Sequence, residues 1–164
     1  MIRQKTVFVV GAGASSEVGL PLGSELQGRI VNVLNAVMAG SSAPSPEFPL
    51  ADAIINSATP DISLEVLLLS CKSIASALRL APSIDDYINA HRSDRSVSIV
   101  GKLAIAHVIL QAERNSAMTL GRLPLTPDSF NGLLKTWYIP LWRALVQGGD
   151  ARHPEVIFEN VQFI

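Results

Sequence analysis

Residues 7–21 read VFVVGAGASSEVGLP, a short apolar run that ends at a glycine-rich turn. The run from Val7 to Val10 has the β-branched and aromatic composition typical of a strand buried on both faces. Gly11 and Gly13 then let the backbone turn tightly and approach a ligand with no Cβ in the way. Backbone N–H groups in such a turn point outward at the positive end of the helix that follows, where they bind phosphate. We therefore predict a strand at residues 6–10 and a nucleotide-binding loop over residues 7–23.

The glycine spacing alone leaves the ligand open. The pattern is G-x-G-x-x-S, with Ser16 where the dinucleotide-binding fingerprint has its third glycine. The stretch also lacks the Lys-Ser/Thr pair of a P-loop, which excludes a Walker-type ATPase. A glycine-rich turn that binds no ligand is the structural alternative.

GAGAS at residues 11–15, followed by GLP at 19–21, resembles the nucleotide loop of sirtuins, which reads G-A-G-I-S and then G-I-P. It is more similar to the sirtuin-like domain of bacterial NAD-consuming antiphage defence proteins. SIDDYINAH at residues 83–91, a long apolar helix ending in Ala-Glu-Arg, and a tryptophan-containing helix at 137–146 match that family loosely. The resemblance implies that NAD is bound by Gly11, Ala12, Gly13, Ala14, Ser15, Gly19, Leu20 and Pro21.

Two departures from the sirtuin pattern argue against protein deacylation. Deacylating sirtuins carry Asp-Phe-Arg after the loop proline, whereas this chain has Leu22-Gly23-Ser24. They also usually contain a four-cysteine zinc module, which a chain with one cysteine, Cys71, cannot build. The three histidines are far apart in the sequence, so we predict no metal site.

The resemblance implies an α/β fold with a Rossmann-like, sirtuin-type parallel sheet core. We expect this core to be incomplete, with a second core strand at about 160–164 and a large helical insertion at about 50–148. In the family, that second strand continues into a Thr-Phe-Asn-Tyr-Asp-type segment whose asparagine contributes to NAD cleavage, with a histidine further on. We therefore expect residues 1–164 to be the N-terminal part of one sirtuin-like NAD-binding domain, inactive alone. A small variant domain that closes with an edge strand is the alternative.

Helical periodicity covers most of the region between the two expected strands. We predict a helix at 24–38 capped by Ser24, and one at 61–80 capped by Asp61 with Cys71 on its apolar face. A short helix at 84–91 begins with the S-x-x-D spacing of a capping box. A helix at 97–118 is apolar almost all round, which favours burial of most of its surface. A last helix is expected from Thr126, and Pro140 should kink or split it.

The composition of the chain limits which classes of partner and which cellular locations are expected. Hydrophobic residues make up 48% of the chain and charged residues 16%, and the net charge is −1, so no basic field attracts nucleic acid. The N-terminal apolar run is too short for a signal peptide, and charged residues or prolines interrupt every longer one. We predict a cytoplasmic protein with no nucleic-acid or membrane partner. The apolar excess indicates a homo-oligomer in the complete protein.

The predicted function is NAD binding and, in the complete protein, hydrolysis of NAD to nicotinamide and ADP-ribose, as in antiphage defence. Such cleavage passes through an oxocarbenium-like state, so water or another nucleophile must be positioned near the ribose. The catalytic residues are unknown; Asp85 and His107 are candidates, although Asp85 also fits as a stabilising first-turn acid. The alternatives are a non-catalytic module that senses NAD or ADP-ribose and regulates a partner, a helical scaffold that binds nothing, and a sirtuin-type deacylase.

Overall fold

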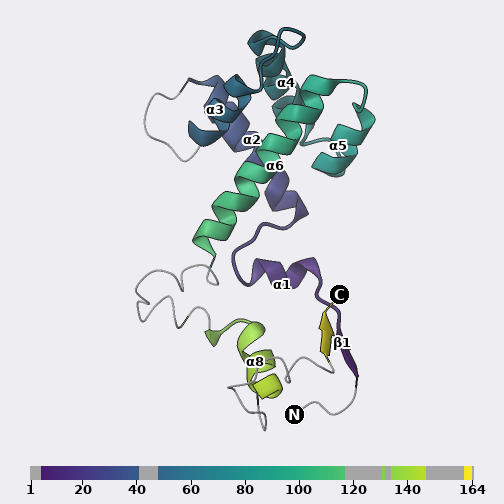
Figure 1. Cartoon of the computed structure of the whole chain (residues 1–164), viewed down its shortest axis with the longest axis vertical. Coiled ribbons are helices and arrows are strands. Elements are labelled where there is room, and N and C mark those ends of the chain that lie inside the picture. Colours follow the sequence, from purple (N-terminus) through teal and green to yellow (C-terminus); the bar gives the residue numbers. More distant parts are fainter. Residues whose placement is uncertain (1–4, 41–47, 117–130, 132–133, 147–160, 164) are drawn as a thin grey trace. The chain divides into compact units, whose positions relative to one another are not determined.

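The computed structural model describes residues 5–40, 48–116, 131, 134–146 and 161–163 (Figure 1). The chain divides into two units, one made of Met1–Leu20 and Glu113–Ile164 and the other of Pro21–Ala112. The described elements, in chain order, are β1 (Thr6–Phe8), α1 (Ala12–Ser16), α2 (Gly23–Met38), α3 (Phe48–Asn56), α4 (Leu64–Ala77), α5 (Ile84–Ala90), α6 (Arg95–Asn115), α8 (Tyr138–Val146) and β2 (Val161–Phe163).

The first unit contains the two described strands, which pair in parallel. Thr6 lies opposite Val161 and Phe8 opposite Phe163, so each strand contributes three residues to the ladder. These positions fall within the two stretches expected to be strands. The pairing brings the two ends of the described chain side by side (Figure 1).

The expectation of an α/β Rossmann-like core is wrong, because the described residues are mostly helical and their sheet has two short strands. A doubly wound core needs several parallel strands covered by helices on both faces. Here the apolar run leaves the ladder after Phe8, and its side chains are not buried on both faces: Val7 is 52% exposed and Val9 81% exposed. A local run of apolar residues therefore produced a short edge-like pairing and not a sheet core.

The second unit is helical and contains the main apolar core. α2 packs against α3 and α4, and α6 contributes a third long apolar face. The core side chains recur every three or four residues along each helix, as burial of one helical face requires. The largest fully buried side chains of this unit are Ile30, Leu34, Leu50, Ile54, Leu67, Cys71, Ile74, Leu78, Val100 and Val108.

Side-chain caps fix where these helices begin. The expected Ser83–Asp86 box is confirmed, because the Ser83 hydroxyl accepts the Asp86 backbone N–H at 3.0 Å. Two expected caps are wrong: α4 is capped by Ser63 and not by Asp61, and α2 begins after Leu22 with no side-chain cap. Each predicted boundary lies within a few residues of the real one, where several polar residues compete for the cap position.

A buried hydroxyl network joins α4 to the start of α6. Oδ1 of Asp94 accepts the backbone N–H of Ser96 at 3.0 Å and that of Val97 at 3.2 Å. It also accepts the Ser96 hydroxyl at 2.6 Å, and Oγ of Ser96 lies 2.7 Å from Oγ of Ser70 on α4. These hydrogen bonds satisfy orphan donors of the first turn of α6 and fix that turn on α4.

α6 also approaches α5 closely at a glycine. A Cβ on Gly101 would lie 2.6 Å from Cδ1 and 2.8 Å from Cγ1 of Ile88. These separations are well below van der Waals contact, so Gly101 lets the two helices pack as near as they do. A side chain at this position would require Ile88 or one of the two helices to move.

The sequence predicts that α6 is buried over most of its surface. In the structure α6 is buried along one stripe only. Val100, Ala104 and Val108 are buried, whereas Lys102 and Leu110 on the other side are exposed. By length and composition alone α6 could cross a membrane, a test that the core helix of a soluble protein also passes. The sequence-based expectation that no segment is apolar enough to span a membrane therefore does not hold for α6 by this test. In this structure the buried stripe of α6 belongs to the core of the second unit.

The last helix differs from its prediction. Thr126 and the proline after it lie outside the described residues. α8 begins at Tyr138, so Pro140 sits in its first turn, where a missing N–H costs no intrahelical hydrogen bond. Residues 131 and 134 are helical and residues 135–137 form a turn, so the helical pattern is split just before α8 and is not kinked within it.

Candidate functional site

The predicted nucleotide loop follows β1 in the first unit. Gly11 has an extended backbone, with φ −84° and ψ 171°, and it is the N-cap of α1. The N–H of Ala14 bonds to the Gly11 carbonyl at 3.0 Å. The N–H groups of Ala12 and Gly13 lie at the start of the helix, where no carbonyl of a preceding turn can accept them. The expected order of strand, glycine and helix is therefore present. Because α1 has only five residues, it aligns few peptide dipoles and has a weak helix dipole.

The start of α1 is open. A Cβ placed on Gly11 or on Gly13 would meet no atom within 4 Å. Ser16, which replaces the third glycine of the fingerprint, donates its hydroxyl to the Gly13 carbonyl at 2.8 Å. The two glycines thus have open space where a Cβ would lie, and the Ser16 side chain hydrogen-bonds to the Gly13 carbonyl.

The second half of the motif, residues 19–21, begins in the turn that ends α1. Gly19 has a φ of +91°, a conformation that side-chain-bearing residues rarely adopt. The Leu20 N–H then bonds back to the Ser15 carbonyl at 3.0 Å. Gly19 has a turn-forming role here, and Pro21 opens the second unit. The structure thus places Gly11, Ala12, Gly13, Ala14 and Ser15 at the loop and the start of α1, and Gly19 and Leu20 in the turn that ends α1.

A tryptophan from the far end of the sequence is anchored on this loop, and sequence reasoning missed it. The indole Nε1–H of Trp137 donates to the Ala14 carbonyl at 2.9 Å, and its backbone N–H donates to Oε2 of Glu17 at 2.9 Å. Tyr138 meets Trp137 edge to face at 6.2 Å and stacks near Trp142 at 6.3 Å. Two hydrogen bonds therefore hold an aromatic group, Trp137–Tyr138–Trp142, at α1, and Glu17 is engaged in that contact.

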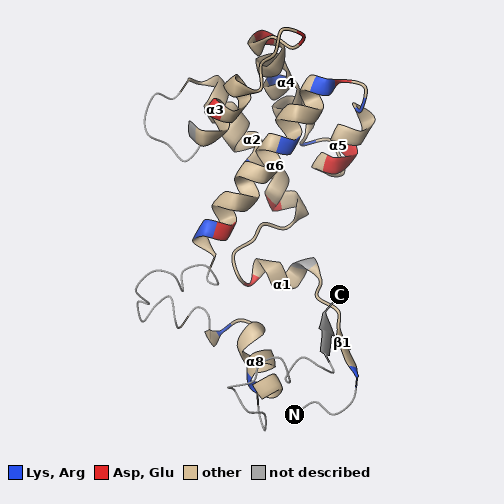
Figure 2. Ribbon diagram, in the orientation of Figure 1, with Lys and Arg blue, Asp and Glu red and all other residues tan. Residues whose placement is uncertain are grey.

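The two catalytic candidates lie in the second unit. Asp85 is exposed in the first turn of α5, where Figure 2 shows acidic residues, and its neighbour Asp86 accepts the Ser83 hydroxyl at 2.8 Å. His107 is half-buried on α6. Among the described residues, no hydrogen bond or ion pair joins Asp85 to His107. The geometry favours the capping role for the acidic pair.

Neither a metal site nor a reactive thiol is found in the described part of the chain. No group of three His, Cys, Asp or Glu side chains there could hold a metal ion. Cys71 is buried in the core, as expected from its position on an apolar face, and burial raises the pKa of its thiol to about 11. It is therefore protonated at neutral pH and is not a nucleophile.

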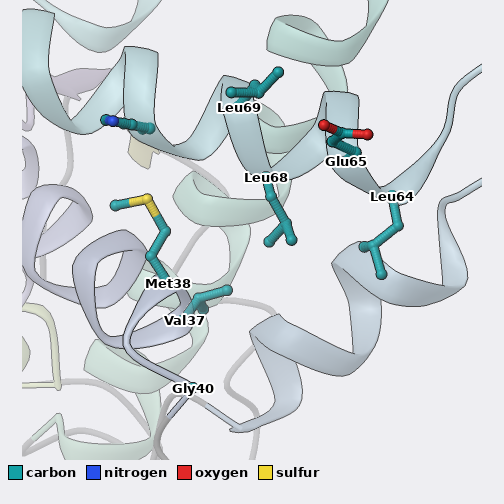
Figure 3. Close-up of a pocket in the computed structure, with 8 residues that line it drawn as sticks. Val37, Met38, Gly40, Leu64, Glu65, Leu68 and Leu69 are labelled. Atoms are coloured by element: carbon teal, nitrogen blue, oxygen red, sulfur yellow. The ribbon is translucent and has the colours of Figure 1, made fainter.

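An open apolar groove lies elsewhere, between the end of α2 and α4 (Figure 3). It encloses about 610 Å³ and has one acid and one base at its margin. Because it lies in the second unit and contains no candidate residue, it is not the predicted nucleotide site. Its lining residues are Val37, Met38, Gly40, Leu64, Glu65, Leu68, Leu69 and Lys72.

Comparison of the chain with protein-family models, with curated proteins and with solved structures finds no match in any of the three. The resemblance to sirtuin-like domains, and the NAD chemistry that it implies, stay predictions.

Proposed function

We propose that the chain binds NAD or ADP-ribose at residues 11–21. The observation that carries this proposal is the anchoring of Trp137 on α1, beside glycines whose surroundings are open. A dinucleotide offers a pyrophosphate, which backbone N–H groups bind, and flat rings, which stack on aromatic side chains. One segment here supplies N–H groups, open space and a neighbouring aromatic group.

The proposal for residues 1–164 is binding and not turnover. Cleavage of the nicotinamide–ribose bond needs a polar group that positions water near the ribose. Among the described residues near the loop, Glu17 is held by the Trp137 backbone N–H. In the complete protein we propose that bound NAD is hydrolysed to nicotinamide and ADP-ribose, with the catalytic group supplied outside the described residues.

Paired glycine variants test the binding proposal by titration calorimetry with NAD, with ADP-ribose and with ATP. Gly13→Val fills open space at the start of α1, whereas Gly28→Val makes the same change at an open helical position of α2. We expect Gly13→Val to weaken NAD or ADP-ribose binding by at least about tenfold, or about 1.4 kcal/mol, and Gly28→Val to leave it unchanged. Circular dichroism of both variants checks that the helices are retained.

Absence of binding heat for every nucleotide would contradict the proposal, as would equal affinities of the wild-type chain and Gly13→Val. Turnover is followed separately by chromatographic detection of nicotinamide from the complete protein. Binding without nicotinamide release would favour a module that senses the nucleotide and regulates a partner.

A further inference from the structure

The exposed face of α4 has an apolar centre where a surface helix normally has polar residues. Leu67, Cys71 and Ile74 fill the buried side of the helix. On the opposite side Leu69 is 59% exposed, and the adjacent Leu68 is 38% exposed. An amphipathic helix that served only its own core would place polar residues at these positions.

The end of α2 extends this apolar face. Met38 is 36% exposed and lines the groove together with Val37 and Leu68. Figure 3 shows the Leu68 and Met38 side chains directed into the space between the two helices, and Leu69 projecting outward from α4. The groove and the exposed leucines form one continuous apolar face, which we call the α4 face.

Two opposite charges flank the α4 face at equal distances from its centre. Glu65 lies one helical turn before Leu69, and Lys72 lies about one turn after it. The two charged residues are seven positions apart in the helix, or about 10.5 Å along its axis, which is too far for them to pair with each other. In the described residues, the ion pair that forms is Arg29–Glu25, so neither Glu65 nor Lys72 has an ionic partner there.

The arrangement of one acid, two leucines and one base along α4 is complementary to a second copy of itself in the antiparallel orientation. A two-fold axis midway between Leu68 and Leu69 sets Glu65 of each copy opposite the second copy's Lys72, and Leu68 opposite its Leu69. A parallel arrangement would instead set acid against acid and base against base. We propose that the α4 face is a homodimer interface, in which a second copy of this chain packs its own α4 antiparallel. This inference is independent of the proposed nucleotide site.

Charge-reversal variants test the arrangement by analytical ultracentrifugation of the full chain over a concentration series. Glu65→Lys places four positive charges at the interface, and Lys72→Glu places four negative ones. We expect each variant alone to weaken dimerisation by at least about tenfold. Mixed in equal amounts, the two variants should form a heterodimer about as stable as the wild-type homodimer, because each position 65 then again faces a position 72 of opposite charge, one pair with the native residues and the other with the two signs exchanged.

Lys102→Glu is the matched control, since it makes the same charge change at an exposed position of α6, and it should leave dimerisation unchanged. Dimerisation of the wild type should also weaken as salt rises. A wild-type chain that stays monomeric at all concentrations would overturn the proposal. So would single variants that dimerise as well as the wild type, or a mixture that fails to form the heterodimer.

Discussion

Replacing Gly101 by alanine is expected to destabilise the second unit, although alanine is much the better helix former. In an open helix the exchange stabilises by about 1 kcal/mol. At Gly101 the new Cβ would lie 2.6 Å from Cδ1 and 2.8 Å from Cγ1 of Ile88, so α5 and α6 must separate or Ile88 must leave its rotamer. Overpacking of this kind costs about 1–3 kcal/mol. The net change in the free energy of unfolding is therefore a loss of up to about 2 kcal/mol.

Gly28→Ala supplies the reference, because a Cβ at that position of α2 meets no atom within 4 Å. We expect it to stabilise by about 1 kcal/mol, which raises Tm by about 2–4 °C in a chain of this size. Urea denaturation of the two variants should therefore give changes of opposite sign or, at the least, differ by about 1 kcal/mol.

A third variant locates the clash. Ile88→Ala removes both crowding atoms, so Gly101→Ala in that background should become neutral or stabilising, with a coupling energy of about 1–3 kcal/mol. If Gly101→Ala raises Tm as much as Gly28→Ala does, the reasoning is refuted, because α5 and α6 would not then approach each other as closely as described.

Ser96→Ala should lower the free energy of unfolding by about 1–2 kcal/mol in urea, because it removes the hydroxyl that links Asp94 to Ser70; an unchanged midpoint would contradict this. The hydrogen bond from the Ser96 hydroxyl, followed by the backbone N–H bonds, holds the pKa of Asp94 below its ordinary value of 3.8. A carboxyl whose pKa is lower in the folded than in the unfolded state stabilises the folded state at pH values above the unfolded pKa. This stabilisation is lost as the pH falls through the folded pKa. Asp94→Asn should therefore flatten the acid side of the stability–pH curve below about pH 4, and a curve parallel to the wild type would argue against it. Cys71 should react with a thiol reagent far more slowly in the native protein than in guanidinium, because it is buried with a pKa of about 11; equal rates would place it at the surface. Trp137→Phe should lower the thermal stability of the first unit by removing the Nε1–H bond to Ala14, as followed by the fluorescence of the remaining tryptophan.

Local signals in the sequence predicted the local structure of the second unit well. The capping box at Ser83 and Asp86 was found because its donors and acceptors lie within four residues. Cys71 was assigned to the core because its neighbours repeat with helical spacing. Such features depend on interactions within one or two turns, and the sequence displays them directly.

The features that depend on distant parts of the chain were not predictable in the same way. The apolar run at residues 7–10 indicates a strand, but whether a strand joins a sheet core depends on partners elsewhere in the chain. Trp137 contacts Ala14 across 123 residues, and nothing in the local pattern of either residue indicates that contact. The only local indication of that contact in the sequence is a tryptophan with polar neighbours.

The division of the chain also sets an order for its folding during synthesis. The second unit, Pro21–Ala112, is continuous in sequence, whereas the first combines residues on both sides of it. β1 cannot pair until β2 at Val161–Phe163 has left the ribosome. At about 5–20 residues per second, the helical unit has several seconds to form before its flanking partner segments meet. The N-terminal glycine loop is therefore synthesised long before the segment that carries Trp137, and a chain that ended after residue 115 would retain the described helices of the second unit and lack that tryptophan.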